Sequence, residues 1–296
     1  MYEGVHALKF EFIEDGAETM VNSINTNAGS LQGVQSLQKA NSSLANTQER
    51  ITTGRDVNGP QDNAALLAIS QILESDVGGL NSVRQSLDRA ISSTDVAVAG
   101  AEEVSNTLIQ LRETAVQAAD PGLDDASRQA LSQQFNALRD QITGIVENSS
   151  FNGTNALQSG GDAISAITSP DGDSSVTVGA QDLSLGGPNV TLTDSQGIGS
   201  AADAQAAVAA IDASIANVTA SLSELGAASQ EFTATREFSQ TLENVTREGI
   251  GNLVDTNLAE ASAQLAADQV RQTLGTQALS ISNSQPSNIL SLFEQS

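Results

Sequence analysis

Apolar and small residues recur at a strict 3,4 spacing between positions 80 and 115, which predicts one long continuous helix. Thr94 is the only polar member of this seam, and its alanines would let a neighbouring helix approach closely. Such a helix, about 54 Å long at 1.5 Å per residue, cannot bury its apolar stripe alone, so another long helix must pack against it. The seam positions are Leu80, Val83, Leu87, Ala90, Thr94, Ala97, Ala101, Val104, Leu108, Leu111 and Ala115.

A weaker seven-residue spacing, interrupted by Asn and Gln, predicts a helix that begins near Leu31 and ends near Gly54. Asp62 or Asn63 is the expected N-cap of the helix that contains the long seam, which should reach about residue 118. An Asp-Pro-Gly turn follows, and a third helix that ends by residue 149 should fold back antiparallel onto the second. Its apolar positions are Leu131, Phe135, Leu138, Ile142 and Ile145.

Between residues 160 and 199 the composition changes to Gly, Ser, Asp and Thr. Short alternating runs at 175–178 and 189–192 predict small surface hairpins, and so short a segment should bury little core. Helical spacing then returns, and this helix should continue through Phe232 and Leu242 toward Val245 until Gly249 and Gly251 interrupt it. Its seam is Val208, Ile211, Ile215, Val218, Leu222 and Leu225.

The last segment has a weak seven-residue spacing like that of the first helix, with Gln272 in an apolar position. These weakly amphipathic terminal helices should fray in isolation and fold only when other copies cover them. An intramolecular two-helix core is the alternative for their leucines. The expected self-assembly residues are Leu37, Leu44, Ile51, Leu258, Leu265, Leu279, Ile289, Leu290, Leu292 and Phe293.

These patterns together predict a mainly α fold. It is a long antiparallel helical bundle or coiled-coil rod built from both chain ends, with a small β-hairpin outer region. Apolar residues make up 39% of the chain but aromatic residues only 3%, so the core must be aliphatic, which suits narrow helix bundles better than a globular enzyme core.

The chain is strongly acidic, with 12 Lys and Arg against 36 Asp and Glu and a formal net charge of −24. Such a surface repels phosphate backbones and anionic lipid headgroups, so we expect no nucleic acid partner. No run approaches the roughly 18 apolar residues of a membrane span, so we expect no membrane insertion. Self-association of such acidic copies should be favoured by salt, which screens charges beyond about 8 Å at physiological ionic strength.

Residue types that carry catalysis or bind metals are scarce. There is no Cys and the only His is His6, which excludes thiolate sites, an HExxH zinc motif and a Ser/His/Asp triad with an internal histidine. The acidic pair Glu102-Glu103 is adjacent on a helix, so its side chains point about 100° apart and cannot form a catalytic dyad. We therefore expect no enzyme activity and no cofactor.

Residues 1–19 differ in composition from the rest of the chain. They hold the only Tyr and the only His, and Met1 and Met20 are the only methionines. We expect Met20 to be the natural start and residues 1–19 to be an N-terminal extension; a short ordered arm is the alternative. This stretch lacks the basic start and apolar run of a secretory signal, so export would use another route.

Several separate motifs occur along the chain: Ser23-Ile24-Asn25-Thr26-Asn27, Arg50-Ile51-Thr52-Thr53-Gly54-Arg55, Asp62-Asn63-Ala64-Ala65, Phe151-Asn152-Gly153-Thr154 and Asn288-Ile289-Leu290-Ser291-Leu292. Together and in this order they resemble bacterial flagellin. The resemblance covers roughly residues 21–158 and 201–296. At 55–64 this chain reads Arg-Asp-Val-Asn-Gly-Pro-Gln-Asp-Asn-Ala, where many flagellins read Arg-Ile-Asn-Ser-Ala-Lys-Asp-Asp-Ala-Ala.

The resemblance implies a subunit that polymerises into the secreted bacterial flagellar filament for swimming motility. The implied partners are further copies of the chain, an export chaperone, the flagellar type III export apparatus, and the hook-associated and cap proteins. A hook-filament junction protein is the alternative, because it would share the helical ends and the export route. The implied domains are a terminal-helix inner domain (21–55 with 252–296), a helical middle domain (56–159 with 200–251) and a variable outer region (160–199).

The segment by which the vertebrate innate receptor recognises flagellins resembles residues 108–117 of this chain. Gln110 stands where an arginine is usual, and Thr114 stands where a leucine is usual. A solvated helix face is the other interpretation of this stretch. The candidate receptor residues are Gln110, Arg112, Glu113, Thr114 and Gln117.

Overall fold

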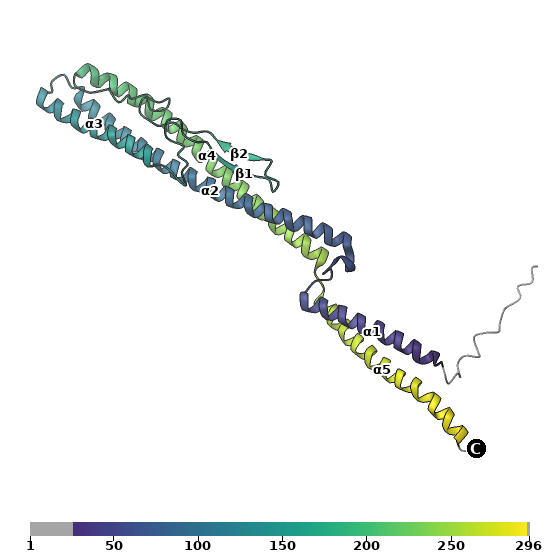
Figure 1. Ribbon diagram of the computed structural model, residues 1–296. Coiled ribbons are helices and arrows are strands. Elements are labelled where there is room, and N and C mark those ends of the chain that lie inside the picture. The colour runs from purple at the N-terminus through teal and green to yellow at the C-terminus, as the bar shows by residue number, and fades with distance from the viewer. Residues whose placement is uncertain (1–25, 295–296) are drawn as a thin grey trace, which may run out of the picture. The chain divides into compact units, whose positions relative to one another are not determined.

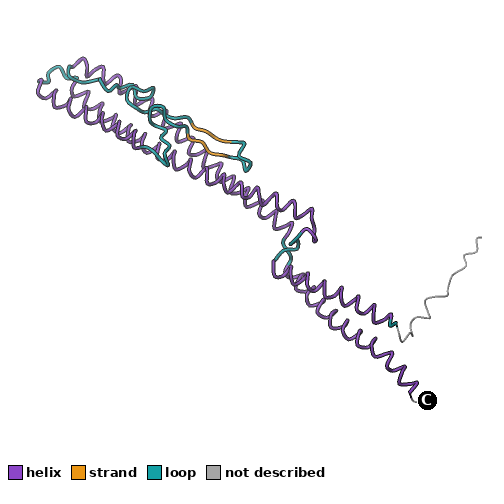
Figure 2. Tube along the Cα trace, in the orientation of Figure 1, coloured by secondary structure: helices purple, strands orange, loops and turns teal. Residues whose placement is uncertain are grey.

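The computed structural model describes the chain from residue 26 to residue 294, and its side chains up to residue 285. Residues 1–25, which contain the expected extension, lie outside this part. The chain forms two compact units, one from the residues up to Ser70 and from Gly251 onward, the other from Gln71–Ile250. The elements (Figures 1 and 2) are α1 (Ala28–Thr53), α2 (Pro60–Ala118), α3 (Asp125–Asn148), β1 (Ile164–Ile167), β2 (Ser175–Val178), α4 (Ala201–Val254) and α5 (Leu258–Glu294).

The first unit contains an antiparallel pair of α1 and α5, in line with the expected antiparallel bundle built from both chain ends (Figure 1). Asn27 caps α1 by accepting a hydrogen bond from the Ser30 backbone N–H. Gly54 ends the helix with φ 72°, a left-handed conformation that glycine adopts without steric cost. The chain then pairs with the start of the C-terminal segment, because the Thr256 N–H donates to the Gly54 carbonyl and the Asp56 N–H to that of Val254.

The expected cap of the long second helix is Asn63. It has an extended backbone (φ −160°), and its side-chain oxygen accepts hydrogen bonds from the backbone N–H groups of Ala65 and Leu66, both at 3.1 Å. Asp62 instead accepts bonds from the N–H groups of Asn58 and the following glycine, which closes the turn before the helix. The prediction that one of these two residues caps the helix is confirmed.

The second unit is a bundle in which α3 and α4 pack along α2 (Figure 1). Every seam position predicted for α2 between Leu80 and Ala115 is buried. Thr94, the polar member, donates its hydroxyl to the Ala90 carbonyl of its own helix, so it leaves no unsatisfied group in the core. Phe135 and Ile142 of α3 are fully buried, as are Ile211, Val218 and Leu225 of α4.

The C-terminal part of α4 departs from the prediction. The helix passes through Gly249 and Gly251 and ends only at Val254. A helical glycine costs only about 1 kcal/mol, which continuous packing against a neighbouring helix can offset. The apolar residues at this end of the helix do not extend the buried face of its first half, because Leu242 and Val245 are exposed.

Residues 160–199 are more closely joined to the bundle than predicted. β1 and β2 form an antiparallel hairpin with Ile164 opposite Val178, which confirms the strand expected at 175–178. No strand forms at 189–192, where a hairpin was expected: Val190 makes only an isolated bridge with Leu185, and the Thr191 N–H and hydroxyl donate to Ser214 and Ala210 of α4 (Figure 2). The expectation of little core is also wrong: Leu183, Val190, Leu192 and Ile198 are fully buried in the core that the helices form.

Among the described helices, α4 is long and apolar enough to cross a membrane by length and composition. The core helix of a bundle passes the same test, and the buried residues of α4 form the bundle core. This helix is therefore weak evidence for a membrane span.

Candidate assembly interface

The α1–α5 pair is held together by close approach at glycines. A methyl group built on Gly275 would lie 3.3 Å from Cδ1 of Leu37, and one built on Gly33 would lie 3.3 Å from Cδ1 of Leu279. Each leucine therefore fits over a glycine of the partner helix. Two of the predicted assembly residues, Leu37 and Leu279, thus contribute to the intramolecular contact.

The other predicted assembly residues differ in burial. Leu44, Ile51 and Leu265 are half-buried, whereas Leu258 is 53% exposed. The side chains of Ile289, Leu290, Leu292 and Phe293 lie outside the part of the chain that the structure describes. A role of all these residues in contacts between copies stays a prediction.

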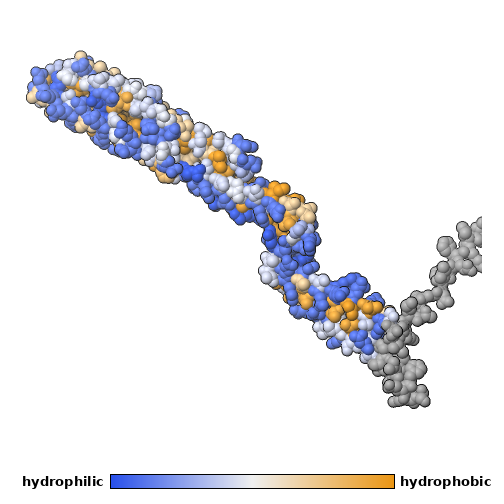
Figure 3. All heavy atoms as spheres, in the orientation of Figure 1, coloured by the Kyte–Doolittle hydropathy of each residue, from blue (hydrophilic) through white to orange (hydrophobic). Residues whose placement is uncertain are grey.

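Sequence reasoning missed a second set of apolar side chains, which point outward from the same pair. Val270, Leu274 and Ile281 of α5 are each more than half exposed, and Leu31 and Val34 of α1 are also exposed. The three α5 residues stand at i, i+4 and i+11, which places them on one helix face. The sequence itself carries the signal, because these apolar residues recur at helical spacing beside the seven-residue leucine spacing of the same segment. Figure 3 shows hydrophobic side chains gathered on the surface of this helix pair.

Asp268 of α5 is a fully buried carboxylate between the two helices. It accepts hydrogen bonds from the hydroxyls of Ser43 (2.9 Å) and Thr47 (3.2 Å) on α1, and from Gln264 and Arg271 on its own helix. Burial raises the pKa of Asp268, but these four hydrogen bonds outweigh that effect and lower the pKa below its ordinary value. The ionised carboxylate therefore fixes the register of α1 against α5.

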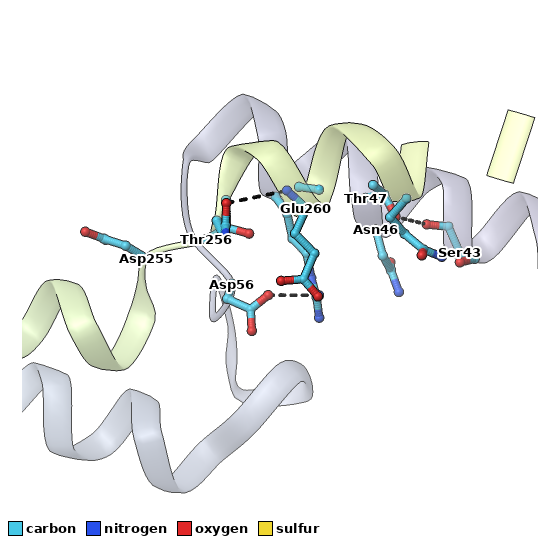
Figure 4. Close-up of a pocket in the computed structure, with 11 residues that line it drawn as sticks. Ser43, Asn46, Thr47, Asp56, Asp255, Thr256 and Glu260 are labelled. Atoms are coloured by element: carbon cyan, nitrogen blue, oxygen red, sulfur yellow. Dashed lines mark hydrogen bonds and ion pairs between the residues drawn. The ribbon is translucent and has the colours of Figure 1, made fainter. Parts of the chain in front are cut away.

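A polar pocket of about 460 Å³ lies beside this carboxylate, where α1 ends and α5 begins (Figure 4). Arg50 and Asp56 form an ion pair of 2.8 Å across it, with both side chains about half exposed. Asp255 and Glu260 add further negative charge to the lining. Among the described residues, no group of three or more His, Cys, Asp or Glu side chains is placed to hold a metal ion.

The candidate receptor residues lie near the C-terminal end of α2 in the second unit. Gln110, Arg112, Glu113 and Gln117 are exposed, whereas Thr114 is 3% exposed and donates its hydroxyl to the Gln110 carbonyl. The Arg112 guanidinium pairs with Asp212 of α4 at 2.5 Å. Thr114 is therefore a core residue, and receptor recognition by the exposed residues stays a prediction.

Comparison with known proteins identifies the family. Residues 24–161 match the bacterial flagellin N-terminal helical region, and residues 208–293 match the bacterial flagellin C-terminal helical region. Flagellin FljM of Caulobacter vibrioides is 39% identical over 273 residues, covering 92% of this chain and 99% of the relative. A flagellin of Brucella melitensis is 29% identical, with the same coverage.

A solved structure described as a putative flagellar hook-associated protein from Vibrio parahaemolyticus has a TM-score of 0.54 and covers 66% of this chain and 98% of that chain. At 13% identity it shows a shared fold and gives no support to the junction-protein alternative. The chain belongs to the bacterial flagellin family, structural proteins rather than enzymes, which polymerise into the extracellular flagellar filament.

Proposed function

We propose that the outward apolar side chains of the α1–α5 pair bind neighbouring copies in the filament. The observation that carries this proposal is the exposure of Val270, Leu274 and Ile281 on one face of α5. A helix pair with apolar side chains both inside and outside is typical of one that is buried in a larger assembly.

The magnitude supports a role in assembly. Full burial of a Val, Leu or Ile side chain stabilises a contact by about 1.5–3 kcal/mol. Three such side chains on each copy therefore contribute several kcal/mol toward adding one subunit. If each face binds a different patch on the next copy and the rotation between copies does not close a ring, growth continues helically.

We also propose the domain division expected from the sequence: an inner domain of 21–55 with 252–296, a middle domain of 56–159 with 200–251, and an outer region of 160–199. The two compact units support separating the terminal helices from the middle bundle. Family membership supports an export chaperone, the type III export apparatus, and the hook-associated and cap proteins as partners.

Seeded growth tests the assembly surface. The double variant Val270→Gln with Leu274→Gln should raise the monomer concentration needed for growth from filament seeds at least tenfold, because burial of the exposed parts of the two side chains is together worth more than about 1.4 kcal/mol. Thr273→Gln is the matched control, since Thr273 is exposed on the same helix but lies outside the face that carries Val270 and Leu274. Growth of the double variant at the control's concentration would refute this surface.

The same assay tests the remaining expectations. A chain truncated before Ile289 should not elongate seeds, because it lacks the four C-terminal assembly residues. Normal filaments from this truncation would remove them from the interface. A subunit that caps seeds without elongating them would be a junction protein, the alternative that the sequence left open.

A further inference from the structure

The sequence contains two Asn-Gly pairs, Asn58-Gly59 and Asn152-Gly153, and their surroundings in the structure differ. Asparagine side chains are chemically labile, and a following glycine shields its own backbone nitrogen least, because it has no Cβ. That nitrogen can attack the side-chain amide carbon of the asparagine when both groups are free to move. The contacts of the glycine nitrogen and of the asparagine amide therefore decide which pair reacts.

Hydrogen bonds hold both residues of the first pair. The backbone N–H groups of Asn58 and Gly59 both donate to Oδ2 of Asp62, at 2.9 Å and 3.0 Å. The side-chain amide of Asn58 donates to the Arg55 carbonyl at 3.1 Å. Attack of the Gly59 nitrogen on the Asn58 side chain would have to break these bonds, so the fold protects this pair.

The second pair forms the tip of a tight turn after α3. Phe151 and Thr154 exchange backbone hydrogen bonds of 2.9 Å and 3.0 Å, and between them Asn152 and Gly153 have φ values of 51° and 84°. Two successive positive φ values are typical of a type I′ turn, which the flanking residues close. Both tip residues are exposed, and within residues 26–285 neither the Gly153 N–H nor the Asn152 side chain makes a hydrogen bond to another residue.

We propose that Asn152 is a site of spontaneous deamidation, at which a neutral amide becomes a carboxylate as the chain ages. The Gly153 nitrogen attacks Cγ of Asn152 and forms a C–N bond, its proton passes through water to the leaving nitrogen, and ammonia departs from a cyclic succinimide. A water molecule then opens the ring at either carbonyl and gives aspartate or isoaspartate. One water is consumed and one ammonia released, without oxidation or reduction.

The modification changes the turn and leaves the bundle folded. Isoaspartate adds one carbon to the backbone, which disturbs the hydrogen bonds between Phe151 and Thr154. Asn155, which follows the turn, is buried; its side chain donates to the Val146 carbonyl of α3 at 2.7 Å and accepts from the Leu157 N–H at 2.9 Å. This anchor holds the chain beyond the turn to the end of α3, so deamidation adds a negative charge to an exposed turn without unfolding the second unit.

Mass spectrometry of peptides from the full-length monomer, incubated in neutral buffer, tests the proposal. Asn152 should be converted faster than Asn58 by about tenfold or more, because a hydrogen bond to a charged acceptor raises the barrier for the Gly59 nitrogen by roughly that factor. In a denaturant the two rates should become similar, since both pairs are then free. Protein isoaspartyl methyltransferase should label the peptide that contains residue 152.

Two results of this measurement would overturn the inference. Equal rates at Asn152 and Asn58 in the folded chain would show that the turn gives no selectivity. Formation of aspartate without isoaspartate would show that water attacks the amide directly, so that the Gly153 nitrogen plays no part. The monomer alone decides these outcomes, so they are independent of whether the chain elongates filament seeds.

Two matched variants test the protection of the first pair. Asp62→Ala removes the acceptor of the Gly59 N–H, so Asn58 should then react at nearly the rate of Asn152. Asp62→Asn keeps an acceptor oxygen, and Asn58 should stay slower than in Asp62→Ala. If Asn58 is equally slow in both variants, hydrogen bonding of the glycine nitrogen does not control the reaction and the argument fails. Asn152→Gln, whose longer side chain would have to close a larger ring, should lose the isoaspartate label, and a label that persists would refute the assignment.

Discussion

Arg128 should be among the most important polar residues for the stability of the second unit. It lies in the first turns of α3, is 8% exposed, and directs its guanidinium at the end of α2. There it donates to the carbonyl oxygens of Ala118, Asp120 (3.0 Å) and Leu123 (3.4 Å). The last carbonyls of a helix have no partner within the helix, so Arg128 caps α2 from outside.

The substitution Arg128→Met keeps an unbranched, flexible side chain, shortens it by the guanidinium group and so removes its hydrogen-bond donors. Each hydrogen bond from a charged donor is worth about 1.5–3 kcal/mol. Since the bond to Leu123 is long, we expect a loss of about 3–5 kcal/mol in the free energy of unfolding. For a unit of this size that is a fall in Tm of roughly 10 °C.

Thermal unfolding of the monomer, followed by circular dichroism, measures this loss. Arg139→Met is the matched control, because Arg139 on the same helix makes one hydrogen bond, of 3.1 Å, to the Gln196 carbonyl. Loss of this single bond should cost about 1.5–3 kcal/mol, less than the loss in Arg128→Met. If both variants melt at the same temperature, the capping argument is wrong.

Three further predictions concern stability. Gly100→Ala should lower the free energy of unfolding by about 1–3 kcal/mol, because the new methyl group would lie 2.8 Å from Cδ1 of the buried Leu157. Gly144→Ala meets nothing within 4 Å and should raise it by up to about 1 kcal/mol. Chemical denaturation measures both changes. Because the pKa of Asp268 is lowered in the folded chain, its ionised carboxylate contributes to the free energy of unfolding above the ordinary carboxyl pKa of about 3.9, and this contribution is lost as the pH falls through the lower pKa of the folded chain. Helicity measured from pH 6 to pH 2 should therefore fall more steeply in the natural chain than in Asp268→Asn. Asp212→Ala, which removes the half-exposed partner of Arg112, should cost less than about 1 kcal/mol in the same denaturation experiment.

Local chemistry determined much of the fold without tertiary information. The seam of α2 was predicted position by position, because a helix with one continuous apolar stripe has only one face that it can bury. Gly54 and Asn63 mark the end of one helix and the start of the next through their own backbone and side-chain geometry. These features depend on neighbours in sequence, so the sequence alone suffices to read them.

Contacts between distant segments decided the rest. Leu242 and Glu243 are adjacent in α4, and Glu243 is the one that faces inward because Arg84 of α2 pairs with it there. Residues 189–192 alternate like a strand, yet α4 offers the Thr191 backbone a hydrogen-bonding partner that no second strand supplies. Arg128 reads in the sequence as an ordinary surface arginine, and only the turn that folds α3 back against α2 brings it to the open carbonyls. Sequence periodicity thus determined which elements form, and tertiary packing decided which polar and apolar side chains those elements leave exposed.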